Sequence, residues 1–239
     1  MKGREIDYDD LKRRGFLRSR EDEYFILRTR MAAGNYGSEH LLKLSEIAKK
    51  YGRGVTHLTV RQGIEVPYVR FEDIEKVEKE IEKTGILAGA SGARLRATTC
   101  CPGNSWCKRG LVNTFSLFNK IENEQGIKCS MDLPHKFKIA VSGCPNTCTR
   151  AQVSEIGIHG EIDLSRPEKR IGYTVYLGGC GGKNPRMGFK LGKVYTEEEV
   201  LSLIKRVVAF YKDNAKTRQR LALLIEETGK EKFLDLIGE

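Results

Sequence analysis

The chain has 239 residues, 39% of them apolar, and it carries a formal net charge of +10 at pH 7. That length allows two modest domains with buried cores. No apolar run approaches the ~20 residues of a membrane span, which argues against a signal peptide or a membrane helix and predicts a soluble, cytoplasmic protein. Because the basic residues are spread along the chain rather than massed in one helix or arm, the charge predicts an anionic small-molecule ligand and argues against a nucleic-acid or membrane partner.

The pattern of residues 1–85 predicts a β-α-β-β-α unit. Residues 24–31 alternate between apolar and polar as a strand does, and a glycine-containing turn separates them from the helical apolar spacing of residues 38–52. Beyond this helix we expect two strands joined by a short turn and then a charged amphipathic helix, at residues 55–60, 64–69 and 72–85.

The glycine-rich segment 85–96 predicts a boundary that divides the chain into domains of residues 1–85 and 86–239. Near the end of the second domain, Thr196 and Glu199 have the spacing of a capping box, which predicts a long helix from Thr196 with one or two short helices after it. The elements expected earlier in this domain are a helix at 111–126 and strands at 136–143, 154–160 and 171–179.

The cysteines are the strongest chemical signal. Seven cysteines in a chain expected to be reduced are better explained as metal ligands or buried thiols than as disulfides. Cys101 and Cys107 form a C-x5-C pair in a turn-rich segment, and Cys144 and Cys148 form a C-x3-C pair directly after a predicted strand. Four thiolates from two loops can enclose a 4Fe-4S cluster. The C-x5-C spacing is unusual for zinc, so the pattern favours iron-sulfur and leaves zinc as the alternative.

These motifs resemble those of the sirohaem and 4Fe-4S sulfite and nitrite reductases. The resemblance rests on "CPGNSWC" at 101–107 and "SGCPNTCTRAQVSEIGIHG" at 142–160, which agree in spacing and in their flanking Pro and Gly. It extends from "RTRM" through "LTVRQGIEVP", residues 28–67, to "LGGCGGKNPRMG", residues 177–188, and covers roughly residues 16–235. It implies an α+β fold in which a ferredoxin-like half-domain precedes an α/β sirohaem and iron-sulfur cluster domain.

The resemblance also implies two cofactors, sirohaem and a 4Fe-4S cluster, and the residues that hold them. Sirohaem carries eight carboxylates, which gives a reason for the excess of Lys and Arg. Arg61 matches an arginine that binds those carboxylates, with Lys183 and Arg186 as further candidates. Cys148 matches the thiolate that also bridges to the sirohaem iron. The implied cluster ligands are Cys101, Cys107, Cys144 and Cys148.

The implied substrate site is a cage of cations made by Arg28, Arg96, Lys136 and Lys138. The alternation of Lys136 and Lys138 puts both on one face of a predicted strand, as a cage requires. The implied activity is the six-electron reduction of sulfite to sulfide, with electrons passing from the cluster through the bridging thiolate to the sirohaem iron. The alternatives are reduction of nitrite to ammonia, or a non-catalytic electron carrier or redox sensor that holds the same cofactors.

Three features of the sequence depart from the family pattern, and the first two bear on the expected partners. The chain has one copy of a module that most members carry twice, which predicts a homo-oligomer. It lacks a C-x2-C-x2-C-x3-C-P run, so electrons must come from a separate donor such as a ferredoxin. Cys100, Cys129 and Cys180 lie outside the ligand set; we expect Cys129 to be a buried thiol, and the sequence assigns no role to the other two.

Overall fold

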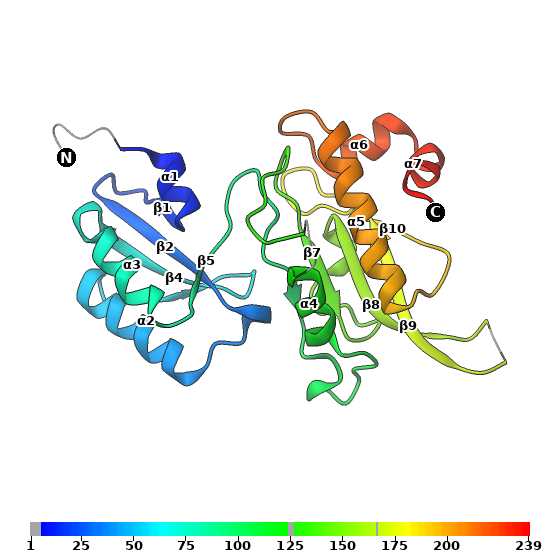
Figure 1. Ribbon diagram of the computed structural model, residues 1–239, viewed down its shortest axis with the longest axis horizontal. Coiled ribbons are helices and arrows are strands. Elements are labelled where there is room, and N and C mark those ends of the chain that lie inside the picture. The colour runs from blue at the N-terminus through cyan, green and yellow to red at the C-terminus, as the bar shows by residue number, and fades with distance from the viewer. Residues whose placement is uncertain (1–5, 124–126, 166) are drawn as a thin grey trace. The chain divides into compact units, whose positions relative to one another are not determined.

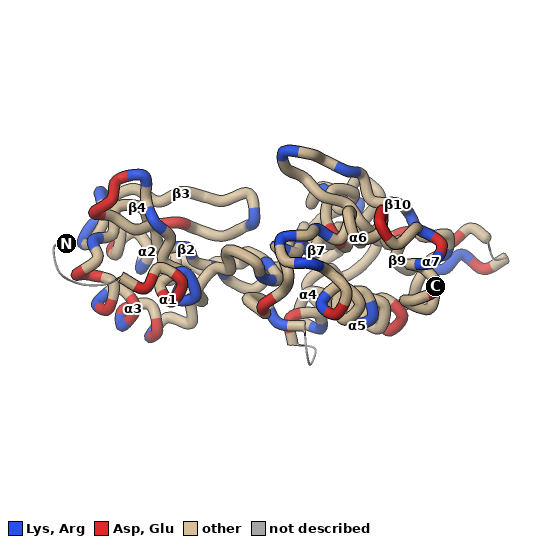
Figure 2. Tube along the Cα trace, turned by 90° about the horizontal axis from the view of Figure 1, so that it is seen from above, with Lys and Arg blue, Asp and Glu red and all other residues tan. Residues whose placement is uncertain are grey.

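The computed structural model describes residues 6–123, 127–165 and 167–239. Within these residues the chain forms two compact units, and the change from the first to the second falls between Gly92 and Ala93. That position lies inside the glycine-rich segment where a boundary was expected. Figure 1 shows the elements of both units, and Figure 2 shows that both units carry Lys and Arg as well as Asp and Glu.

The described part of the first unit combines an antiparallel sheet with helices. Its strands are β1 (Phe16–Arg18), β2 (Tyr24–Arg30), β3 (His57–Leu58), β4 (Ile64–Arg70) and β5 (Leu87–Ala88), and its helices are α1 (Tyr8–Arg13), α2 (Ser38–Tyr51) and α3 (Ile74–Glu82). The strands pair in the order β1-β2-β4-β3, and β5 pairs with the last residues of β2. Helices α2 and α3 lie side by side and share their core with the sheet (Figure 1).

The core of the first unit follows from the alternation in β2. Phe25, Leu27 and Thr29 are buried, whereas Arg28 and Arg30 point to the other face and are half-buried. Successive side chains of a strand point to opposite faces, so one face of β2 is buried and the other carries both arginines. Apolar residues at helical spacing close over the buried face, namely Leu44, Ile47, Ala48, Ile74, Val77 and Ile81.

The strand expected at residues 55–60 is much shorter than predicted. Only His57 and Leu58 pair with β4. The Thr59 N–H donates to the Gly63 carbonyl at 2.8 Å, so the chain reverses directly after Leu58. Leu58 is 76% exposed, because an edge strand of two residues has no second layer to cover it. Turn geometry therefore overrides the alternating apolar pattern here.

The second unit is built on a mixed sheet. Its strands are β6 (Thr99–Cys100), β7 (Ile139–Ser142), β8 (Ile156–Asp163), β9 (Arg170–Leu177) and β10 (Phe189–Lys190), in the order β10-β9-β8-β7-β6. Strands β6, β7 and β8 are parallel neighbours, whereas β8, β9 and β10 pair antiparallel. The centre of the sheet is buried on both faces, since all four residues of β7 are buried. A strand that is buried on both faces shows no alternation of apolar and polar residues in its sequence.

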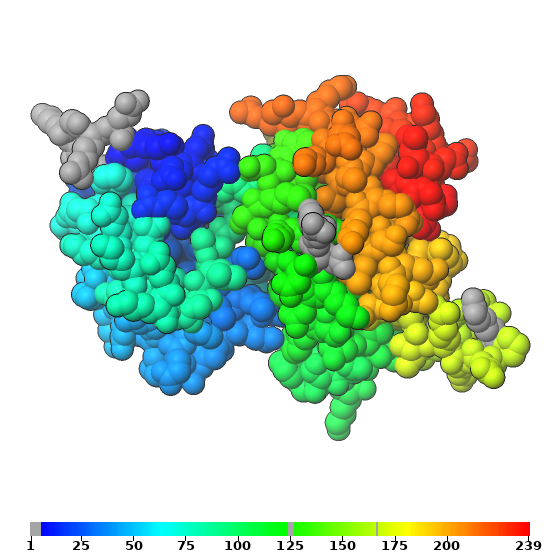
Figure 3. Space-filling view, viewed as in Figure 1, coloured from blue at the N-terminus to red at the C-terminus, as the bar shows by residue number. Residues whose placement is uncertain are grey.

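Helices cover the second sheet. They are α4 (Thr114–Asn123), α5 (Glu197–Asn214), α6 (Leu221–Thr228) and α7 (Lys230–Ile237). The predicted capping box is present: the Thr196 N–H donates to Glu199 Oε2 at 2.7 Å, and the Glu199 N–H donates to Thr196 Oγ1 at 3.2 Å. Helices α6 and α7 pack beside α5 at the C-terminal end of the chain (Figures 1 and 3). None of the described helices is long and apolar enough to span a membrane.

Four expected elements of the second unit differ at their ends. The strands expected at 154–160 and 171–179 are Ile156–Asp163 and Arg170–Leu177. The helix expected at 111–126 begins at Thr114, and its predicted last residues, 124–126, lie outside the described residues. The strand expected at 136–143 begins at Ile139. Short 3₁₀ turns complete the described elements of the chain, at Ala32–Gly34, Phe71–Asp73, Gly103–Ser105 and Ala151–Val153.

Candidate iron-sulfur and oxyanion site

The two cysteine loops leave the same edge of the second sheet. Because β6 and β7 are parallel neighbours, their carboxyl ends lie together, which is where open α/β sheets commonly bind ligands. Cys101 directly follows β6, and its N–H donates to the Val141 carbonyl of β7 at 3.2 Å. Cys144 follows β7 after the single residue Gly143. The sheet therefore brings together two cysteine pairs that are distant in sequence.

Glycines set how closely these loops approach each other. A Cβ at Gly143 would lie 2.5 Å from the Cα of Gly103, so only glycine fits there without moving the backbone. Gly103 itself has a φ of 55°, in the left-handed region that favours glycine. The Gly143 N–H donates to Cys101 Sγ at 3.1 Å. A backbone amide aimed at a sulfur stabilises the thiolate that a metal centre requires.

The four predicted ligands differ in exposure. Cys101 and Cys144 are half-buried, and Cys107 and Cys148 are exposed. An open groove of about 500 Å³, with Arg109 at its edge, reaches Cys144. The second loop is also strained, since residues 147 and 150, on either side of Cys148, have φ values of 46° and 57° without being glycine. The loop thus holds its second thiol in a turn that few sequences adopt.

The paired thiols match a 4Fe-4S cluster in number. A cubane takes one thiolate at each of its four irons. Two loops with two cysteines each supply that number, and the C-x5-C spacing is longer than the C-x2-C to C-x4-C pairs usual for zinc.

The other cysteines are distinct from the candidate ligands. Burial raises the pKa of Cys100 to about 12, and the neighbouring Cys101 adds to the rise, so this thiol stays protonated at neutral pH. Cys129 was expected to be buried, and that prediction is wrong. It is half-buried, because it lies in a turn closed by the Met131 N–H and the Lys128 carbonyl at 3.0 Å. Cys180 is buried in its glycine loop.

The backbone of Arg96 lies beside the segment that carries Lys136 and Lys138. Leu95 bridges Phe137 in parallel register, and the Arg96 N–H donates to the Phe137 carbonyl at 2.8 Å. Leu95 and Phe137 are 1% and 0% exposed, so they turn into the core. Lys136 and Lys138, on either side of Phe137, are only half-buried. Although they precede β7 instead of belonging to it, they show the alternation that places both on one face.

Positive charge gathers around His135. Burial lowers the pKa of His135, and the charges of Arg220, Lys136, Arg96 and Arg218 lower it further. A cation raises the cost of protonating a nearby imidazole only when it is close. The lowered pKa of His135 thus reflects positive charge on the segment that leads into β7 and on the α5–α6 connection.

The two predicted residues of the first unit lie in or next to its sheet. Arg28 in β2 is already paired, because its Nε and Nη2 each lie 2.7 Å from Glu65 Oε1. Arg61 lies in the tight turn before β4, where its N–H donates to Thr59 Oγ1 at 3.3 Å. Gln62, the next residue, has a φ of 60°, which fixes the course of this turn.

The later glycine loop holds the remaining candidates. Lys183 is exposed. Arg186 forms an antiparallel bridge with Cys180, and its Nη2 lies 3.1 Å from Glu226 Oε2 in α6. That ion pair also depresses the pKa of the Glu226 carboxyl. The charge of Arg186 thus ties the loop to α6.

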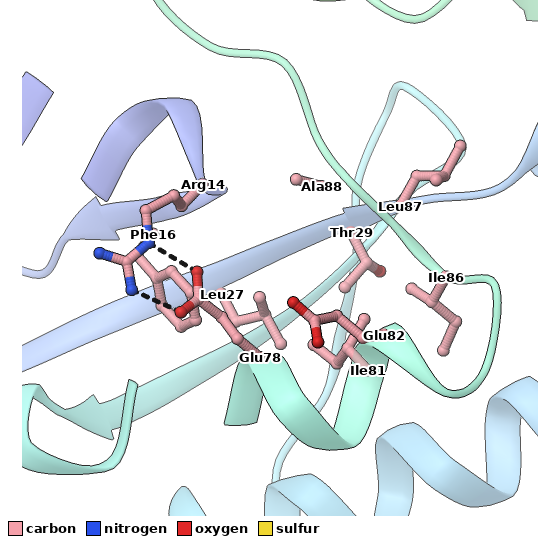
Figure 4. A pocket seen from close by; sticks show the side chains of 10 residues that line it. All are labelled: Arg14, Phe16, Leu27, Thr29, Glu78, Ile81, Glu82, Ile86, Leu87 and Ala88. Atoms are coloured by element: carbon pink, nitrogen blue, oxygen red, sulfur yellow. Dashed lines mark hydrogen bonds and ion pairs between the residues drawn. The ribbon is translucent and has the colours of Figure 1, made fainter. Parts of the chain in front are cut away.

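A cavity of about 230 Å³ in the first unit offers no comparable site (Figure 4). Its walls are largely apolar, with Phe16, Leu27 and Ile81 among them. At its edge Arg14 Nε donates to Glu78 Oε1 at 2.7 Å, and the two charges offset each other. Because an oxyanion needs polar or charged groups around it and this cavity is lined mainly by apolar side chains, we do not assign the substrate to it.

Four residues in or next to residues 134–138, here called the lysine segment, were not predicted from the sequence: His135, Glu155, Arg218 and Arg220. Glu155 is fully buried and paired with Arg220, although 65 positions separate them. Such a contact cannot be predicted from a local sequence pattern, because a buried ion pair between distant residues produces no repeating spacing of residues as a helix or strand does. Only the adjacency of His135 to the predicted Lys136 could have indicated a role for it.

Comparison with known families identifies both units. Residues 91–239 match the nitrite and sulphite reductase 4Fe-4S domain, and residues 18–84 match the nitrite/sulfite reductase ferredoxin-like half domain. Together with the paired cysteine loops, these matches define an iron-sulfur oxidoreductase. The chain belongs to the nitrite and sulphite reductase family, whose cofactors are a 4Fe-4S cluster and sirohaem. The resemblance seen in the sequence is confirmed.

Individual relatives agree with this assignment. The chain is 30% identical to a coenzyme F420-dependent sulfite reductase of Methanocaldococcus jannaschii over 94% of its own length, and it spans 44% of that protein. It is 26% identical to an assimilatory-type sulfite reductase of Nitratidesulfovibrio vulgaris, covering 91% of this chain and 94% of the relative. Among solved structures, the Mycobacterium tuberculosis NirA protein has a TM-score of 0.81 at 20% identity, over 97% of this chain and 46% of the other. The α+β fold is therefore confirmed.

Proposed function

We propose that the protein reduces sulfite to sulfide by six electrons. The observation that carries the proposal is that Arg96 lies beside Lys136 and Lys138, through the hydrogen bond from its N–H to the Phe137 carbonyl, on the segment that leads into β7. A cysteine loop follows the far end of β7. Cations so placed favour a small oxyanion over a neutral ligand. An electron carrier or sensor has no use for them, which sets the reductase above that alternative.

The residues of the chain have distinct tasks in this proposal. Lys136, Lys138 and Arg96 neutralise the bound oxyanion and supply protons as its oxygens leave as water. The four cysteines of the two loops would hold the cluster, and Cys148 would also serve the sirohaem iron. When bound, the cluster and sirohaem supply the electrons and the iron that takes the substrate.

Four further assignments follow the resemblance. Arg28, which pairs with Glu65, is assigned to the oxyanion, and Arg61 is assigned to the sirohaem carboxylates. Lys183 and Arg186 are assigned to the same carboxylates, and Arg186 has to exchange Glu226 for that role. Electrons are proposed to come from a separate carrier such as a ferredoxin.

Turnover with sulfite and with nitrite tests the proposal. Lys136→Ala and Lys138→Ala are expected to lower kcat about 100-fold to 1,000-fold at unchanged cofactor content, since each removes one electrostatic stabiliser. Lys212→Ala, on the exposed side of α5, serves as the control and should leave kcat unchanged. A higher kcat/KM for nitrite than for sulfite would transfer the assignment to nitrite reduction, and no turnover of either would favour the carrier or sensor.

We also propose that the working form is a homo-oligomer, most simply a two-fold dimer. The residues that the structure describes hold one copy of a module that, by the resemblance, most of the family carry twice in one chain or as two related subunits. Two-fold pairing is the commonest way for identical copies to associate. Analytical ultracentrifugation of cofactor-loaded protein should give a dimer. A monomer that still turns over sulfite would show that one module suffices.

A further inference from the structure

A buried carboxylate lies behind the predicted substrate lysines. Glu155, just before β8, is 0% exposed. Its Oε2 accepts a hydrogen bond from the Lys138 backbone N–H at 2.8 Å, and its Oε1 accepts one from Arg220 Nε at 2.6 Å. A second Arg220 nitrogen, Nη2, bonds to the same Oε1. Both carboxylate oxygens are therefore engaged, as a buried charge requires.

Arg220 reaches this carboxylate from a distant part of the chain. It lies in the connection between α5 and α6, which runs beside the segment leading into β7 (Figure 1). The Arg218 N–H donates to the Pro134 carbonyl at 2.9 Å. In α5 itself, the ring of Tyr211 packs against that of Phe137 with centroids 5.1 Å apart. Helix α5 and the connection after it thus contact the lysine segment at Phe137 and at Pro134.

Arg220 also stabilises the buried charge of Glu155. Burial raises the pKa of Glu155, and the charge of Arg220 and its hydrogen bonds oppose that rise. The arginine therefore holds the carboxylate in the orientation in which its Oε2 accepts the Lys138 N–H.

We propose that the Glu155–Arg220 ion pair is a positioning device for Lys138. Glu155 fixes the lysine's backbone through the N–H contact, and Arg220 holds the Glu155 carboxylate in the orientation that makes this contact. Neither residue contacts the substrate. The inference rests on the proposed function, because it assumes that Lys138 binds the oxyanion.

Kinetics of single and double variants test this device. Arg220→Gln is expected to lower kcat for sulfite about 10-fold to 100-fold, the usual effect of removing a residue that orients a functional group. Arg220→Lys should restore most of that loss, because an ammonium can also pair with Glu155. In a Lys138→Ala background, Arg220→Gln should cost little more, since residues that act through one another are not additive. Additive losses would overturn the proposal.

A second readout does not depend on turnover. Hydrogen exchange at the Lys138 amide of cofactor-loaded protein should become faster in Glu155→Ala and stay slow in Glu155→Gln, whose side-chain oxygen still accepts the N–H. Equal exchange in both variants would overturn the positional role. Arg206→Gln is the matched control, because Arg206 pairs with Glu239 in the same unit and should leave this amide unchanged.

The two proposals fail in different ways. If Lys138→Ala leaves kcat unchanged while Glu155→Ala still speeds exchange at Lys138, the substrate assignment is wrong, and with it the claim that the pair serves catalysis. If Lys138→Ala slows turnover and Arg220→Gln does not, at equal cofactor content, the proposed function stands and the positioning role is refuted. Arg220→Lys that folds, loads cofactor and regains no turnover would also refute it.

Discussion

Replacing Gly143 with alanine should separate the two cysteine loops. The added Cβ would lie 2.5 Å from the Gly103 Cα, 0.9 Å short of the 3.4 Å at which ordinary contact begins. Both sides of the clash are fixed to backbone, so no change of rotamer relieves it. A shift of that size exceeds the ~0.5 Å within which functional groups must be held. We expect a loss of about 1–3 kcal/mol in the free energy of unfolding and loss of most of the cluster.

The assay is iron and acid-labile sulfide per chain after anaerobic reconstitution, measured beside the melting temperature. Gly192→Ala is the control, because its Cβ would meet nothing within 4 Å, and it should bind as much sulfide as the unaltered protein. If Gly143→Ala holds the same sulfide and melts at the same temperature as the control, the close approach of the loops is not what forms the cluster site.

Other variants test single groups. Cys148→Ser should lose activity and the coupling of the cluster to sirohaem, whereas Cys180→Ser should keep the cluster; equal loss of cluster iron in both would show that the ligands are misassigned. In cofactor-free protein at about pH 8, iodoacetamide should label the exposed Cys107 and spare Cys100, whose buried thiol has a pKa of about 12, and mass spectrometry of the peptides would reveal the opposite pattern. The pKa of His135 lies below its ordinary value of 6.5 in the folded protein, so the unfolded chain binds a proton more readily and stability should fall as pH drops through about 6.5. His135→Gln should flatten that fall in denaturant titrations, and an unchanged slope would assign it to other groups.

The helices and strands whose apolar residues recur at a regular spacing could be predicted from the sequence. Strand β2 and helices α2 and α5 were expected within a few residues, because each buries one face of a regular element. The short elements α1, β1, β5, β6 and β10 were missed. Segments of two to six residues contain too little of any period to be recognised, and they form because longer neighbours pair with them or pack on them.

The candidate site could be predicted only in part. The cysteine pairs and the lysine alternation are local, so the sequence shows them directly. The Glu155–Arg220 pair could not be predicted, because it depends on how the α5–α6 connection packs in the folded unit. The ion pair of Arg28 with Glu65 was invisible for the same reason, since two paired strands place them opposite each other.

The most direct test of the account is the metal and sulfide content of purified, fully loaded protein, read with its optical spectrum. We predict about four acid-labile sulfides and about five irons per chain, four in the cluster and one in sirohaem, with the bands of a chlorin-type haem that shift when sulfite is added. Zinc without acid-labile sulfide or haem bands would contradict it.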